Sequence, residues 1–149
     1  SRNKWDLRFI ELAKHIAQWS KDPGTKVGAV IVRPNRTIAS VGYNGLPRGI
    51  SNEESILADR PTKLALTVHA EVNAIIHAKE PLNGCSLFVW PFQPCSHCAA
   101  KIIQTGIQRV VAPNNPPANN DWLVSFSLAR HAFKHAIVIL DFVAPDGQR

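Results

Sequence analysis

The chain has 149 residues, 45% of them hydrophobic, a length and composition that predict one globular domain over residues 1–149 with a buried core. No apolar run is long enough to span a bilayer, no signal peptide opens the sequence, and three cysteines are too few for a disulfide framework, so we expect a cytoplasmic protein without a membrane partner. The net charge of +6 suits anionic ligands. Because the 17 Lys and Arg residues form no stripe or tail, it favours a small phosphorylated molecule over a nucleic acid.

The first third of the chain predicts a helix followed by a hairpin. Residues 5–19 carry apolar side chains at helical spacing, and the Asp-Pro-Gly sequence at 22–24 ends this amphipathic helix. A continuous apolar run at 27–32 predicts a buried strand. After a turn at 34–36, residues 37–43 form the return strand of the hairpin.

The middle of the chain predicts two longer helices separated by a strand. Residues 44–49 form a loop, and a short helix is expected within 51–59. Apolar residues and good helix formers at 67–79 predict a buried helix. A strand at 85–90 precedes a second helix that begins at Pro94 and stops at Gly106.

The last third completes an α/β pattern. We expect a strand at 109–112, a rigid polar loop at 113–117, a helix at 121–134 and a closing strand at 136–142. This order predicts a three-layer α-β-α fold in which a five-stranded mixed sheet has helices on both faces. Helical crossovers join the third, fourth and fifth strands, so these three should run parallel.

Two short motifs supply the ligands of a metal site. His69 and Glu71 are expected in the first turn of one helix, and Cys95 and Cys98 in the first turn of the next. One imidazole and two thiolates bind zinc and leave its fourth position open, which is typical of a catalytic rather than a structural site. Glu71 is too close to His69 in sequence to be a good ligand to the same ion, and it is well placed to move protons beside it.

Other interpretations of these motifs fit the sequence less well. A redox pair at Cys95 and Cys98 would leave His69 and Glu71 without a role. A closed structural zinc site would need Cys85 as the fourth ligand, but Cys85 opens an apolar strand and is expected to be a small buried residue. His97 points away from the face that carries the two cysteines, so we expect it at the surface or at the rim of a pocket.

Three blocks of the sequence carry a family resemblance. The first is SKDP at 20–23 leading into VGAVIV at 27–32, the second is GYNGLPRG at 42–49, and the third is HAE at 69–71 with PCxxC at 94–98. The third block is the zinc nucleobase deaminase signature. Together the blocks resemble the cytidine/deoxycytidylate deaminase superfamily, and most closely its deoxycytidylate (dCMP) deaminases.

The resemblance implies an activity and its catalytic residues. The expected reaction is the hydrolytic deamination of a cytosine nucleotide, dCMP to dUMP and ammonia, in pyrimidine nucleotide metabolism. His69, Cys95 and Cys98 would bind Zn²⁺. Glu71 would take a proton from the attacking water, pass it to the ring, and later protonate the departing amine.

The resemblance also implies a set of substrate contacts. Asn44 would hold the sugar hydroxyl, and the backbone N–H of Ala70 would reach the ring oxygen. The pyrimidine would lie against a group of apolar residues: Val27, Gly28, Ala29 and Phe92. From the sequence alone, Val27 and Ala29 also fit a purely structural role in the core, and Asn44 one in turn chemistry.

The phosphate contact is where the chain departs from the family. Many dCMP deaminases carry charged residues or tyrosine in the loop after the fourth strand, whereas residues 113–122 contain neither Lys nor Arg. Lys26 or Arg48 could supply the missing charge. Relatives are often oligomers regulated by dCTP and dTTP, so a homo-oligomer with such an effector is a further expectation.

The sequence also allows functions other than dCMP deamination. A deaminase of nucleic acid, acting on tRNA adenosine or on cytidine in single-stranded DNA or RNA, shares the zinc motif. We would expect it to contact RNA through a basic terminal helix, which the pattern of residues 1–149 does not predict. A deaminase of a free nucleoside or base would need no phosphate contact. A non-catalytic zinc module would leave Glu71 and the open coordination position without a purpose.

Overall fold

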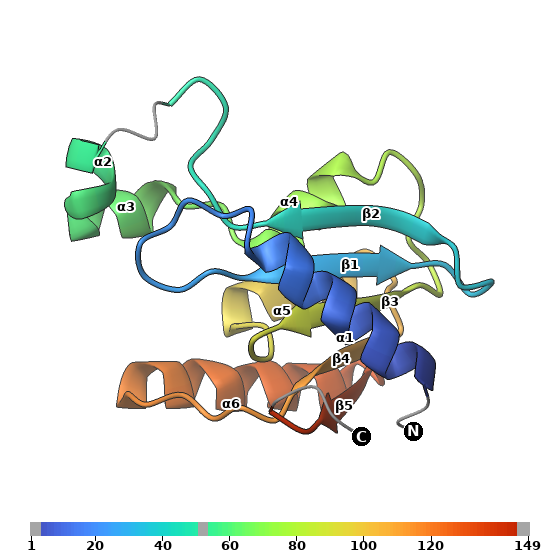
Figure 1. The fold of residues 1–149 in the computed structure, drawn as a ribbon. Helices are drawn as coiled ribbons and strands as arrows, with labels where there is room; N and C mark the ends of the chain where they lie inside the picture. The colour runs from blue at the N-terminus through green and yellow to red at the C-terminus, as the bar shows by residue number, and fades with distance from the viewer. Residues whose placement is uncertain (1–3, 51–53, 146–149) are drawn as a thin grey trace.

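The computed structural model describes residues 4–50 and 54–145 and has a five-stranded sheet between layers of helices (Figure 1). The strands are β1 (Gly28–Val32), β2 (Ile38–Tyr43), β3 (Ser86–Trp90), β4 (Arg109–Pro113) and β5 (Ile139–Val143). The helices are α1 (Lys4–Ala17), α2 (Glu54–Ala58), α3 (Arg60–Leu66), α4 (Ala70–His77), α5 (Ser96–Gln104) and α6 (Asn120–His135). None of the helices in these ranges is long and apolar enough to cross a membrane.

The sheet is mixed, as the sequence predicts. Its strand order is β2-β1-β3-β4-β5. Strand β1 pairs antiparallel with both β2 and β3, whereas β3 with β4 and β4 with β5 are parallel. The parallel pairs follow from the helical crossovers α5 and α6, so the predicted α-β-α class is confirmed.

Helices cover both faces of the sheet because the central strands are apolar on both sides. In β1, Val30 and Val32 pack with α1, while Ala29 and Ile31 belong to the core that α4, α5 and α6 complete. Alternate residues of a strand point to opposite faces, so a continuous apolar run is buried on both. Figure 1 shows α1 crossing one face while α5 and α6 lie on the other.

A close approach between α4 and the sheet positions the start of that helix. A Cβ atom on Gly42 of β2 would lie 2.5 Å from the carbonyl oxygen of Ala70 and 2.5 Å from the amide nitrogen of Ala74. A side chain at this position would therefore push the helix away. Glycine lets the first turns of α4 rest directly on β2.

The starts of three elements differ from the sequence prediction by two or three residues. Helix α5 begins at Ser96 rather than at Pro94, so Cys95 caps that helix and does not lie in its first turn. Helix α4 begins at Ala70 rather than at residue 67, so His69 caps the helix from an extended conformation and does not lie in its first turn. Strand β5 begins at Ile139, since Ala136 caps α6 and Ile137 has a positive φ of 59°. The short helix expected within 51–59 is α2 at its C-terminal part, while residues 51–53 lie outside the described ranges.

Helix α3 was not predicted at all. It begins after Asp59, and Pro61 occupies its first turn, where a missing N–H costs no hydrogen bond. The sequence Asp-Arg-Pro at 59–61 was therefore a usable helix-start signal. The segment after this signal has too few apolar residues to show a helical repeat, so no second signal indicated a helix.

Candidate metal centre and active site

Two helix starts meet at one end of the sheet and bring three ligand side chains together. His69 caps α4 and Cys95 caps α5, both from extended conformations, and Cys98 lies in the first turn of α5. His69 Nδ1 lies 3.2 Å from Cys98 Sγ and 3.6 Å from Cys95 Sγ. The three ligand atoms all lie within 4.8 Å of one another.

This donor set fits a zinc ion. One imidazole nitrogen and two sulfurs are ligands that zinc prefers, and three protein ligands leave a tetrahedral position for water or substrate. Within residues 4–50 and 54–145, no other group of three or more His, Cys, Asp or Glu side chains could hold a metal. Cys85 is buried as predicted but is no member of the cluster, so the described residues offer an open site and not a closed four-ligand one.

The electrostatics of the cluster favour a thiolate. Hydrogen bonds from Cys98 and then from His69 lower the pKa of Cys95 to about 4. The same contact with Cys95, followed by burial, raises the pKa of the Cys98 thiol, because two sulfurs this close share one negative charge. Hydrogen bonding to Cys95 also raises the pKa of His69. A divalent cation would relieve the shared charge by stabilising both sulfurs as thiolates.

Glu71 is a buried carboxyl group beside this cluster. Its exposed fraction is 4%, and it lines the same cavity as His69 and Cys95. Burial raises its pKa to about 7, while its own backbone N–H and the charge of His69 act in the opposite direction. A carboxyl group with a pKa near neutrality both accepts and returns protons at ordinary pH, which suits general acid–base catalysis.

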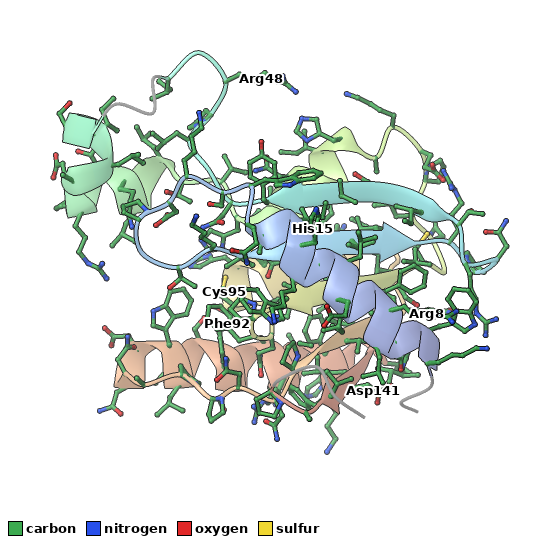
Figure 2. The ribbon with its side chains drawn as sticks, in the orientation of Figure 1. Arg8, His15, Arg48, Phe92, Cys95 and Asp141 are labelled. Atoms are coloured by element: carbon green, nitrogen blue, oxygen red, sulfur yellow. The ribbon has the colours of Figure 1, made fainter. Side chains whose placement is uncertain are left out.

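A cavity of about 320 Å³ opens onto the cluster and is large enough for a small ligand. His69 and Cys95 of the cluster line this cavity together with Glu71, and the part of the cavity beside them is called its inner end. Figure 2 shows Cys95 and Phe92 close together beside α5, on the side of the molecule where α3 and the start of α6 lie. Residues of α3 and of the first turns of α6 complete the wall.

The predicted substrate residues divide between the cavity and the rest of the protein. The cavity is lined by Val27, Asn44, Ala70 and Phe92. Three others are not among its lining residues. Gly28 packs against the backbone of α1, Ala29 is fully buried in the core, and Lys26 is exposed.

Asn44 lines the cavity and also stabilises the neighbouring backbone through hydrogen bonds. Its Oδ1 accepts a hydrogen bond from the Val27 N–H at 2.9 Å, and its Nδ2 donates to the Thr25 carbonyl oxygen at 2.8 Å. Its own carbonyl oxygen accepts a bond from Ser20 Oγ at 2.8 Å. Asn44 therefore holds the segment before β1 in place, while its buried side chain still borders the cavity.

Several residues that line the cavity were not predicted from the sequence. An aromatic wall joins Phe92 to α6, with ring centroids 5.5 Å apart for Phe92 and Phe126, and 6.4 Å for Phe92 and Trp122. Helix α3 contributes Arg60 and Lys63. Their placement depends on tertiary packing, which a single sequence does not reveal. His97, expected at the surface or pocket rim, is exposed and is not a lining residue.

Known proteins share this sequence over most of its length. A family model described as the cytidine and deoxycytidylate deaminase zinc-binding region matches residues 3–113. An uncharacterized deaminase in the luxG 3′ region of Aliivibrio fischeri is 51% identical over 111 residues, which make up 74% of this chain and 74% of that protein. The deoxycytidylate deaminase of Homo sapiens is 35% identical over 156 residues and covers 93% of this chain and 86% of its own.

Solved structures share the fold. The dCMP deaminase of cyanophage S-TIM5, in complex with dCMP and dUMP, aligns with a TM-score of 0.76 at 23% identity and covers 96% of this chain and 99% of its own. A diaminohydroxyphosphoribosylaminopyrimidine deaminase/reductase from Thermotoga maritima aligns with a TM-score of 0.66 at 24% identity, over 95% of this chain and 37% of its own. At these identities the similarity establishes the fold alone.

Proposed function

The chain belongs to the cytidine and deoxycytidylate deaminase family and is a hydrolytic deaminase, and on that premise we propose that it converts dCMP to dUMP and ammonia. The observation that carries the proposal is the buried Glu71, which lines one cavity with His69 and Cys95 of the three-ligand cluster. The choice of dCMP is supported by relatives named deoxycytidylate deaminase that cover 93% of this chain. The proposed place of the reaction is pyrimidine nucleotide metabolism, where dUMP is a precursor of dTTP.

The proposed zinc ligands are His69, Cys95 and Cys98. Bound there, zinc supplies a Lewis acid that makes water a nucleophile at neutral pH. The two helix starts bring partial positive charge towards the thiolates, which stabilises them in the charged form that a metal requires. Both helices are fixed by packing on the sheet, so the ligands keep their positions when substrate enters.

Glu71 is the proposed proton carrier. Its carboxylate takes a proton from the attacking water and delivers it to N3 of the cytosine ring, which makes C4 electrophilic. The water oxygen then bonds to C4, and Glu71, again a carboxylate, takes the remaining proton of that oxygen and gives it to the amine. The C4–N bond breaks, ammonia leaves, and C4 keeps the oxygen as the carbonyl of a uracil base. One carboxyl group serves as base and then as acid, and its pKa near 7 suits both roles.

The cavity wall provides the proposed contacts to the rest of the nucleotide. The N–H of Ala70, at the start of α4, is assigned to the ring oxygen, because the first amides of a helix have no partner within it. Phe92 supplies an aromatic surface for the base, and Val27 lies in the same cavity. Asn44 is assigned to the sugar hydroxyl.

A substrate panel tests this proposal. Purified zinc-loaded protein is assayed with dCMP, CMP, deoxycytidine, cytidine and 5-methyl-dCMP. We expect dCMP to have the highest kcat/KM, and Glu71→Gln to lower kcat by roughly a hundredfold or more while the protein stays folded and keeps its zinc. Turnover of none of these compounds by a zinc-loaded protein would contradict the proposal and would point to tRNA or single-stranded DNA.

A further inference from the structure

Helix α3 turns one side towards the cavity. The cavity-lining residues of this segment are spaced at i, i+3, i+4 and i+7, which is one face of a helix: Arg60, Lys63, Leu64 and Thr67. Thr67 lies two residues before His69 and so belongs to the inner end. Arg60 begins the helix, about 10 Å further along its axis. The helix thus runs along the cavity from the metal ligands outwards.

The second basic residue of this face is already neutralised. Lys63 Nζ lies 2.9 Å from Asp22 Oδ1, and the two side chains are only 10% and 8% exposed. Asp22 Oδ1 also accepts a hydrogen bond from the N–H of Gly24 at 2.7 Å. A buried and paired Lys63 therefore brings no surplus positive charge to a ligand, and its effect is to tie α3 to the segment before β1.

Arg60 is differently placed. Its side chain is exposed, and it makes no ion pair with any residue of the described ranges. The adjacent carboxylate of Asp59 accepts a hydrogen bond from Thr62 Oγ1 at 2.7 Å, within its own helix turn. His69 is assigned to the metal. Among lining residues that the structure describes, Arg60 is thus the basic side chain left for an anionic ligand.

The other basic residues considered for this role lie elsewhere. Lys26 and Arg48 are both exposed and are not among the residues that line the cavity. Arg48 Nη2 lies 2.9 Å from Nε2 of His77, on the outer part of α4. The loop that opens α6 contains no Lys or Arg between residues 113 and 122. None of these positions contributes a Lys or Arg side chain to the lining of the cavity.

We propose that Arg60 binds the 5′-phosphate of the substrate and sets the preference for a nucleoside monophosphate over a nucleoside. The inference rests on the proposed function, which places the amine of the base at His69 and Glu71. The phosphate of a nucleotide lies at the other end of the molecule from this amine. Arg60, at the start of α3, lies at the end of the helix away from the metal ligands. The planar guanidinium group donates two parallel hydrogen bonds to phosphate oxygens, which a single lysine ammonium does not reproduce.

Two Arg60 variants and one matched control test the assignment. Arg60→Gln removes the charge, and Arg60→Lys keeps it without the bidentate geometry. Arg8→Gln is the control, because Arg8 is an exposed arginine of α1 at the far side of the molecule from α3 and is not a lining residue (Figure 2). The readouts are kcat/KM for dCMP and deoxycytidine, and the affinities for dUMP and deoxyuridine from calorimetry.

Arg60→Gln should lower kcat/KM for dCMP and the affinity for dUMP by roughly ten- to a hundredfold, with deoxycytidine and deoxyuridine unchanged. Arg60→Lys should lose less, and Arg8→Gln should match the wild type. Equal losses for phosphorylated and unphosphorylated compounds, or no loss for either, would overturn the assignment.

The binding data separate this inference from the proposed function. If the wild type deaminates no dCMP, the proposed function fails, and the affinities still decide the role of Arg60. Tighter binding of dUMP than of deoxyuridine, lost in Arg60→Gln, would support the phosphate contact. Equal affinities of the wild type for the two compounds would overturn it.

Discussion

Cys98 and Cys85 are both buried cysteines, but only Cys98 lies in the ligand cluster with His69. Cys98→Ala removes one of three ligands, so we expect zinc content per chain, measured after dialysis by atomic emission, to fall to a small fraction of the wild-type value. Melting temperature should also become insensitive to added zinc, because a ligand that binds only the folded state stabilises it. Cys85→Ala is the matched control.

The control should keep its zinc and lose only stability. Cys85 belongs to the core cluster that also contains residues of α4 and α5, so its truncation leaves a small cavity and costs about 1 kcal/mol of unfolding free energy. Zinc retained by Cys98→Ala and lost by Cys85→Ala would show that the ligand set is wrong.

At the residue scale, the sequence was most informative where chemistry fixes the side chain. A metal site needs particular ligand types at particular spacings, so His69, Cys95 and Cys98 could be named from the sequence, and the structure brings them together. Arg60 and Trp122 could not be named. A basic or aromatic residue has many uses on a surface, and only the packing of α3 and α6 turns these two towards the cavity.

At the element scale, an ion pair joins the end of β1 to the segment after α4. Arg33 Nε lies 2.9 Å from Glu80 Oε2, and the hydrogen bond from Arg33 lowers the pKa of Glu80. A carboxyl group whose pKa is lower in the folded state stabilises the protein above its unfolded pKa. That contribution is lost as the pH falls through the folded pKa.

Glu80→Gln should therefore lower the unfolding free energy slightly at neutral pH and leave it equal to the wild type in acid. The effect should be small and should shrink further with added salt, because both side chains are about one-third exposed. Urea titrations across the acid-to-neutral range measure the difference. A gap between the two proteins that widens in acid would contradict the sign of the argument.

Elements with a regular apolar pattern could be predicted from the sequence, and helix α3, which lacks one, could not. Helix α1 has apolar residues on every turn, and strand β1 is an apolar run that is buried along its whole length. Helix α3 has 7 residues and is tied to the body through the Lys63–Asp22 pair, a contact between residues far apart in sequence. Its start signal at Asp59 and Pro61 is local, but no periodic pattern follows it.

At the scale of the whole molecule, the order of strands and helices was enough to assign the fold class. Crossover helices dictate parallel neighbours, and the hairpin dictates the antiparallel edge, so the mixed sheet follows from the chain order. The single domain, the homo-oligomer and the dCTP or dTTP effector stay predictions. Each depends on surfaces or on partners that local sequence patterns do not specify.

The most direct test of the account is deamination of dCMP in water enriched in ¹⁸O, followed by mass spectrometry of the product. Hydrolysis at C4 predicts dUMP that carries one solvent oxygen in its base, formed rapidly by the wild type and at a rate lower by roughly a hundredfold or more in Glu71→Gln. Unchanged dCMP, or labelled dUMP formed equally fast by both zinc-loaded proteins, would contradict the account.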